Sequence, residues 1–184
     1  MHRRTAIRNL ALIIGGAALL PACMQEKGKA TVALKNVDIN AEQETLVGDI
    51  AETIIPKTNT PGAKDLDLHL FVLKMLDDCY KKEEQQSFMT GMAQFTDAVK
   101  KKYNKTFADL PVKQREEMLL GIEADKDPKS TALPKELKTF YGIIKGQTVN
   151  GYTNSKYFMT KQVVYELVPG RYNARFPYKQ KQSA

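Results

Sequence analysis

The sequence predicts an all-α fold: a single irregular domain of about six helices with long loops, placed after an N-terminal signal and lipoprotein segment. Two observations support this prediction. Apolar residues recur every three or four positions over several stretches, which is the spacing of one helix face. Clusters of Pro, Gly, Asn and Thr separate those stretches, and no stretch alternates strongly between apolar and polar residues as a strand would.

The first helix is expected to begin after Asn40, whose side chain can cap it while Gln43 completes a capping box. Pro56 ends this helix, and the sequence PKTNTPGAKD is typical of a loop of turn-forming residues. A second helix is expected to start at Asp65. The inner face of the first helix is predicted to carry Leu46, Val47, Ile50 and Ile54, and that of the second Leu66, Leu70, Leu73 and Met75 or Leu76.

A third helix is predicted from about Glu83 to Tyr103 and carries the clearest apolar stripe in the chain: Phe88, Met92, Phe95 and Val99. A stripe of Met and aromatic residues at this spacing is more typical of a core than of a ligand site.

Two later segments, 109–122 and 132–146, each place a proline near the first helical turn, where its missing N–H costs nothing. A short helix is expected at 159–164. The inward-facing residues of the two longer segments are predicted to be Met118, Leu119 and Ile122, and Leu137, Phe140, Tyr141 and Ile144.

Residues 1–22 have the composition of an export signal. Arg3 and Arg4 lie in a basic segment without acidic residues, and an apolar run of eleven residues follows at 10–20. This run is too short to cross a bilayer, which needs about 20 helical residues. The arginine pair resembles a twin-arginine signal, but Ala-Ile-Arg follows it in place of the preferred Phe-Leu-Lys, so the general secretory route stays open.

The sequence Leu-Pro-Ala-Cys at 20–23 resembles a lipoprotein box, which predicts lipidation of Cys23. An ordinary cleavage site is the alternative. Residues 23–38 are then expected to be a tether, residues 39–177 the folded domain and residues 178–184 a basic tail. The protein is expected at the periplasmic face of the cell envelope, held by its lipid.

The net charge of +7 is confined to the two ends of the chain. Residues 23–170 hold 21 basic and 21 acidic side chains, so the predicted domain is neutral. Nucleic-acid binding requires basic charge concentrated on the folded surface, and the sequence therefore does not favour it.

No sequence motif for catalysis, cofactor binding or metal binding is present: the chain lacks a Gly-x-Gly-x-x-Gly fingerprint, a Walker loop, His-Glu-x-x-His and Cys-x-x-Cys. His69 is the one histidine after the signal and is expected to be a packed or rim residue. Cys79 is expected to be buried, with an intersubunit disulfide as the alternative.

The remaining candidates are loops rich in residues that fix backbone shape, PKTNTPGAKD, NGYTNS and VPGRY. They are explained either by turn chemistry or as a docking surface, for which Tyr152, Arg171 and Tyr172 are the favoured anchors.

Taken in order, IAETIIPKTNTPGAKD, LDDCY, TVNGYTNS and YELVPGRYNARFP, behind an arginine-pair signal, resemble the gluconate 2-dehydrogenase subunit 3 family. The resemblance implies a helical, non-catalytic subunit that binds a large FAD-containing dehydrogenase subunit, commonly alongside a cytochrome c subunit with haem c. It also implies that the small subunit assists export, maturation or anchoring of the flavoprotein. The partner-contact candidates are Pro61, Gly62, Cys79, Gly151, Tyr152, Ser155, Pro169, Gly170, Arg171 and Tyr172.

Two alternatives belong to other classes of protein. A freestanding envelope lipoprotein would bind a small ligand or an envelope component as a monomer. A hydrolase would need a nucleophile and base that no motif reveals.

Overall fold

The computed structural model describes residues 28–125, 132–163 and 170–175, and these residues form helices without a β-strand. The prediction of an all-α fold is confirmed. In chain order the elements are α2 (Ala41–Ile54), α3 (Leu68–Cys79), α4 (Lys82–Tyr103), the 3₁₀ turn η1 (Phe107–Asp109), α5 (Val112–Ala124), α6 (Lys135–Thr153) and the π-helical turn η2 (Phe158–Gln162). None of the helices in these ranges is both long and apolar enough to cross a membrane.

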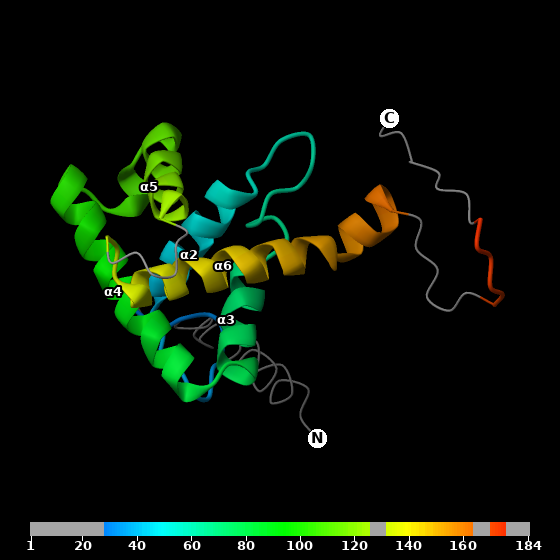
Figure 1. Cartoon of the computed structure of the whole chain (residues 1–184), viewed down its shortest axis with the longest axis horizontal. Helices are drawn as coiled ribbons and strands as arrows, with labels where there is room; N and C mark the ends of the chain where they lie inside the picture. The colour runs from blue at the N-terminus through cyan, green and yellow to red at the C-terminus, as the bar shows by residue number, and fades with distance from the viewer. Residues whose placement is uncertain (1–27, 126–131, 164–169, 176–184) are drawn as a thin grey trace, which may run out of the picture.

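Helix α6 runs through the middle of the molecule, against α4 and α3 along most of its length and against α2 behind it (Figure 1). Helices α2, α3 and α4 run successively up, down and up beside it. One end of the molecule therefore holds the start of α2 and the turn between α3 and α4. The opposite end holds the loop between α2 and α3.

Helix α2 begins as predicted. The Asn40 side chain accepts a hydrogen bond from the Gln43 N–H at 2.9 Å, and the Gln43 side chain accepts one from the Asn40 N–H at 3.0 Å. This capping box satisfies two backbone donors that would otherwise lack an intrahelical partner.

Helix α3 begins later than predicted. Its first residue is Leu68, preceded by Asp67 in the left-handed region at φ 51°. Asp65 does not cap the helix, because its carboxylate accepts hydrogen bonds from the Gly62 N–H at 3.0 Å and the Lys57 ammonium at 2.9 Å. The face that α3 buries includes Val72, which the sequence pattern did not select, whereas the predicted Leu70 and Met75 are only half-buried.

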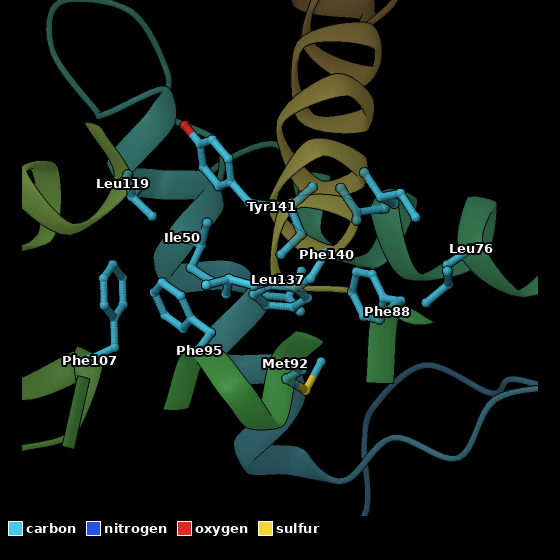
Figure 2. Packing of buried hydrophobic residues seen from close by; sticks show 14 of the residues in the cluster. Ile50, Leu76, Phe88, Met92, Phe95, Phe107, Leu119, Leu137, Phe140 and Tyr141 are labelled. Carbon is cyan, nitrogen blue, oxygen red and sulfur yellow. The ribbon is translucent and has the colours of Figure 1, made fainter. Parts of the chain in front are cut away.

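The core lies where α4 and α6 cross (Figure 2). The four residues of the predicted α4 stripe are all buried, at 2% exposure or less. The Phe140 ring of α6 lies 4.9 Å from the Phe88 ring and 5.7 Å from the Phe95 ring, measured between centroids. Such tilted aromatic pairs add about 0.5–1.5 kcal/mol beyond the burial of their area.

Glycine permits the close crossing of α4 and α6. A Cβ at Gly91 would overlap the backbone carbonyl of Glu136, in the first turn of α6. The two backbones therefore approach more closely here than any residue with a side chain would allow.

Residues 28–39, which we call the strap, pack along the surface of the helices ahead of α2. Val37 and Ile39 are buried in the core cluster, and Ala30, Val32 and Leu34 pack partly against it. The part of the expected tether that the structure describes, from residue 28 on, is thus attached to the folded body.

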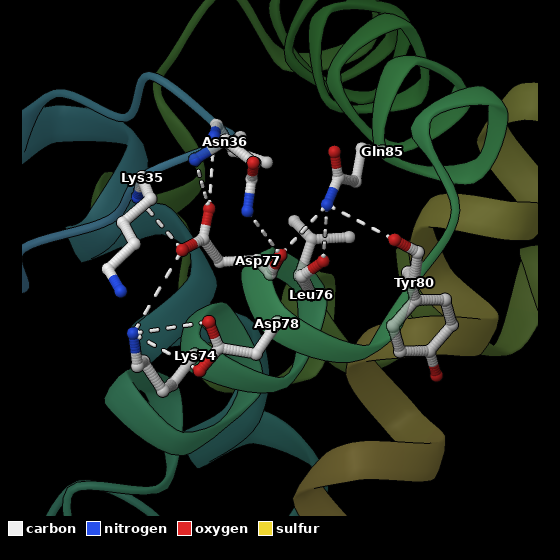
Figure 3. A network of polar contacts seen from close by, with 9 residues as sticks. Lys35, Asn36, Lys74, Leu76, Asp77, Asp78, Tyr80 and Gln85 are labelled. Atoms are coloured by element: carbon white, nitrogen blue, oxygen red, sulfur yellow. Dashed lines mark hydrogen bonds and ion pairs between the residues drawn. The ribbon is translucent and has the colours of Figure 1, made fainter.

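A buried carboxylate of α3 binds the strap (Figure 3). Asp77 accepts hydrogen bonds from three consecutive backbone N–H groups, those of Lys35 at 2.8 Å, Asn36 at 2.6 Å and Val37 at 3.1 Å. Burial raises the pKa of Asp77, but these three donors and the Lys74 ammonium at 4.0 Å outweigh that effect and hold the pKa below its usual value.

A second carboxylate binds the strap nearer its start. Glu44 of α2 accepts hydrogen bonds from the Thr31 N–H at 2.8 Å and the Val32 N–H at 3.2 Å, and its other oxygen accepts one from the Thr31 hydroxyl. Together the two acids fix the strap along the start of α2 and the end of α3.

Candidate functional site

The described residues contain no group of three or more His, Cys, Asp or Glu side chains that could hold a metal ion. His69 lies on α3 beside Gly48 of α2, half-buried, and within the described part of the chain its Nδ1 is buried without a hydrogen-bond partner. This setting matches the packed or rim histidine expected from the sequence.

The loop at 56–67 is held in one shape by a carboxylate of α2. Glu52 accepts hydrogen bonds from the backbone N–H of Lys57 at 3.0 Å and of Lys64 at 2.8 Å, near the two ends of the loop. Gly62 lies close to this carboxylate and to the backbone of Lys57. A Cβ added at Gly62 would lie 2.5 Å from the Glu52 Oε1 and 2.6 Å from the Lys57 backbone nitrogen. Only glycine fits at this position without displacing the loop.

The same loop carries two ion pairs. Lys57 pairs with Asp65 at 2.9 Å, and Lys64 pairs at 2.5 Å with Asp49, which is itself buried. The hydrogen bond from Lys57, followed by that from the Gly62 N–H, lowers the pKa of Asp65. The loop is therefore a preformed structure and loses little conformational entropy if another protein binds it.

The end of α6 packs against this loop. A Cβ at Gly151 would lie 2.8 Å from the Phe71 ring, so glycine allows α6 to pass close to α3. Tyr152 packs partly buried against a small apolar cluster of Ala51, Ala63 and Leu68, in which Ala63 belongs to the loop. The structure thus places Tyr152 against the loop that carries the candidates Pro61 and Gly62.

The prediction of a loop at NGYTNS is wrong for its first four residues, because α6 continues to Thr153. The contact of Gly151 with Phe71 supplies the packing that keeps this polar, glycine-containing turn helical. Ser155 then shapes the following turn: its hydroxyl donates to the Tyr152 carbonyl at 2.7 Å and accepts from the Phe158 N–H at 3.1 Å.

We call the surface formed by loop 56–67, the last turn of α6 and η2 the loop end of the molecule. This surface carries a group of aromatic rings. The centroid of the Tyr152 ring lies 6.4 Å from that of Tyr157 and 5.8 Å from that of Phe158. Tyrosine and phenylalanine on a rigid backbone are common anchors of protein interfaces.

The other sequence candidates are placed elsewhere or not described. Cys79 is exposed at the end of α3 remote from the loop, so the expectation that it is buried is wrong. Its thiol follows Asp77 by two positions and therefore points away from the face that α3 buries. Gly170, Arg171 and Tyr172 are exposed, Tyr172 at 94%. Arg3, Arg4, Cys23, Pro169 and the basic tail lie outside the described residues.

A second surface was missed by the sequence reasoning. Gly142 and Gly146 lie one turn apart on the exposed face of α6, with nothing within 4 Å of an added Cβ, and Val149 follows at 43% exposure. Unlike Gly91 and Gly151, these glycines serve no close contact among the described residues. The spacing Gly-x-x-x-Gly in YGIIKG was the signal that could have revealed this surface.

Comparison with known proteins gives one result. A family model described as "Gluconate 2-dehydrogenase subunit 3" matches residues 41–170, which include α2 to α6, loop 56–67 and η2. No curated protein and no solved structure shows a significant match to the chain.

Proposed function

The chain belongs to the gluconate 2-dehydrogenase subunit 3 family, the small subunits of dehydrogenase complexes, and from this premise we propose that it is a non-catalytic subunit that binds a large FAD-containing dehydrogenase subunit. The observation that carries the proposal is the extent of the family match, which spans the folded body from α2 to Gly170. The likeness therefore concerns the body and does not depend on the export signal.

The chemistry of the body supports an accessory role. Its buried acids Glu44, Asp49 and Asp77 are each bound by donors of the fold itself, so their charges serve the structure. The flavin, and haem c where a cytochrome c subunit takes the electrons, are proposed to reside in the partners. A sugar or a sugar acid is the proposed substrate class of the complex.

The loop end is the surface that best fits a large protein partner. It combines a backbone fixed by Glu52 and Asp65 with the rings of Tyr152 and Tyr157. The exposed Arg171 and Tyr172 are proposed to contact the same partner.

The signal sequence supplies the rest of the proposal. Arg3 and Arg4 would direct export, and a lipid on Cys23 would hold the complex at the periplasmic face of the membrane. A twin-arginine route would explain how a flavoprotein that has already folded around FAD is exported together with its small subunit.

Co-production with an FAD-containing dehydrogenase large subunit of the same organism tests the proposal. We expect a yellow complex to co-purify with this chain, and we expect the flavoprotein made alone to be poorly exported and poorly active. A flavoprotein that matures, is exported and works equally well without the chain would refute the proposal, and a monomer that binds a small ligand would favour a freestanding lipoprotein.

A matched pair of variants locates the interface. Arg171→Ala with Tyr172→Ala removes two exposed side chains and is expected to reduce co-purification without changing the fold. Lys113→Ala with Glu116→Ala removes two exposed side chains of α5 and serves as the control.

A further inference from the structure

The strap fixes the point at which the folded body begins. The Gly28 carbonyl accepts a hydrogen bond from the Ala41 N–H at 3.1 Å, and Lys29 forms an isolated antiparallel bridge with Asn40. The first described residue of the strap is therefore attached to the start of α2.

We call this end of the molecule the strap end: it comprises Gly28, the cap of α2 and the turn from Cys79 to Lys82 that joins α3 to α4 (Figure 1). Asp77, two residues before Cys79, binds the strap here. The loop end lies at the other end of α2, a helix of 14 residues and therefore about 21 Å long.

Only five residue steps separate Cys23 from Gly28. Even fully extended, five residues span no more than about 18 Å. If the loop end touched the membrane with α2 standing upright, Gly28 would lie about the length of α2, roughly 21 Å, above it, which is farther than this link can reach from a lipid on Cys23.

We propose that the strap end is the membrane-facing surface of the lipidated protein and that the loop end points away from the lipid headgroups. This inference rests on the proposed lipid anchor, and it places the proposed partner-binding surface where a large periplasmic subunit has room to dock. The source of the orientation is the short link between the anchor and the strap.

Charge does not supply the orientation. The exposed residues at the start of α4 are Lys81, Lys82, Glu83 and Glu84, which balance each other. A surface with both signs gains little from anionic lipids, unlike a polybasic patch. The preference for the strap end is therefore expected to be the same on neutral and on anionic vesicles.

The native thiol provides the probe. Cys79 is exposed at the strap end, and acylation of Cys23 leaves it as the one free thiol of the mature chain. A fluorophore on Cys79 of the protein extracted from membranes would report its distance from lipid once the protein is reconstituted into phosphatidylcholine vesicles that carry a nitroxide on some headgroups. The comparison is a fluorophore at Asn59→Cys, in the exposed loop at the other end, in a Cys79→Ser background.

We expect severalfold stronger quenching at position 79 than at position 59. Equal quenching at the two positions, or stronger quenching at 59, would overturn the proposal. A mature chain whose mass shows no acyl group would also overturn it, while leaving the subunit proposal intact, because these measurements need no flavoprotein. Conversely, loss of the flavoprotein interaction would leave the quenching ratio unchanged.

A second pair of variants tests the role of the strap. Glu44→Gln with Asp77→Asn removes both carboxylates that bind the strap. Release of the strap increases the chain length between the lipid anchor and the folded body to the eighteen residue steps from Cys23 to Ala41. The quenching ratio is then expected to fall toward one. The control variant, Glu42→Gln with Asp78→Asn, changes two neighbouring exposed acids and is expected to keep the quenching ratio of the native protein. If the variant that lacks Glu44 and Asp77 also kept the native quenching ratio, the strap would not set the orientation.

Discussion

Asp77 and Asn36 bind each other twice. The Asn36 backbone N–H donates to the Asp77 Oδ1 at 2.6 Å, and the Asn36 side-chain amide donates to the Asp77 backbone carbonyl at 3.0 Å. The second bond satisfies a carbonyl near the end of α3, which Gln85 of α4 also reaches at 3.0 Å. Asn36, Asp77 and Gln85 thus join the strap, α3 and α4.

Asp77→Asn is expected to destabilise the protein by about 1–3 kcal/mol, because an amide cannot accept from all three strap N–H groups and leaves a donor without its partner. Urea denaturation followed by circular dichroism measures this change. Asp78→Asn is the control: Asp78 is exposed, its ion pair with Lys74 spans 3.2 Å, and its removal is expected to change stability by less than about 1 kcal/mol. Equal effects of the two substitutions would contradict the role given to Asp77.

The same carboxylate makes stability depend on pH. Because the folded-state pKa of Asp77 lies below 3.8, the usual value for an aspartate, its contribution to stability is present above that pH and is lost as the pH falls through the lowered folded-state pKa. We expect the free energy of unfolding of the native protein to fall more steeply below pH 3.8 than that of Asp77→Asn. Parallel curves for the two proteins in this acid range would show that Asp77 does not carry the effect.

Gly91 of α4 and the two exposed glycines of α6, Gly142 and Gly146, are expected to respond in opposite ways to alanine. Gly91→Ala places a Cβ against the Glu136 carbonyl and should cost about 1–3 kcal/mol through overpacking. Gly142→Ala and Gly146→Ala meet open space and should each stabilise the isolated subunit by about 0.5–1 kcal/mol through helix propensity. The melting temperatures of the three variants test this prediction. A lower melting temperature for Gly142→Ala or Gly146→Ala would contradict the open surroundings of these two glycines.

Phe140→Ala is expected to cost about 3–5 kcal/mol, since this fully buried ring contacts Phe88 and Phe95 at the crossing of α4 and α6. Tyr172→Ala, which removes a ring that is 94% exposed, is the control and should stay within about 0.5 kcal/mol of the native protein. The midpoint of chemical denaturation gives both values.

Arg3→Lys with Arg4→Lys is expected to block export of the chain and of its flavoprotein partner if the twin-arginine route carries them. Cell fractionation followed by immunoblotting measures the distribution of both polypeptides. Unchanged export would assign the chain to the general secretory route.

The local rules of helix formation predicted much of the fold. The capping box of Asn40 and Gln43 and the α4 stripe from Phe88 to Val99 needed only short-range spacing, and both are present in the structure. The core residues Leu137, Phe140 and Ile144 were predicted by the same reasoning.

The features that sequence reasoning missed depend on contacts between distant residues. The strap is held by Asp77, some forty residues along the chain, and no spacing rule links them. The last turn of α6 stays helical because Gly151 meets Phe71, although its own residues favour a loop. Asp65 is a residue type that commonly caps a helix, but its carboxylate accepts hydrogen bonds from Gly62 and Lys57 instead of from the start of α3.

The loop between α2 and α3 has the composition of a site for limited proteolysis, with Pro, Gly, Asn and Thr in succession. A protease must draw several residues of extended chain into its cleft, and here that would break the bonds of Glu52 to both ends of the loop. Digestion of the native protein should therefore leave this loop uncut. A fragment in which α2 and α3 remain joined would show that the hydrogen bonds of Glu52 protect the loop from the protease.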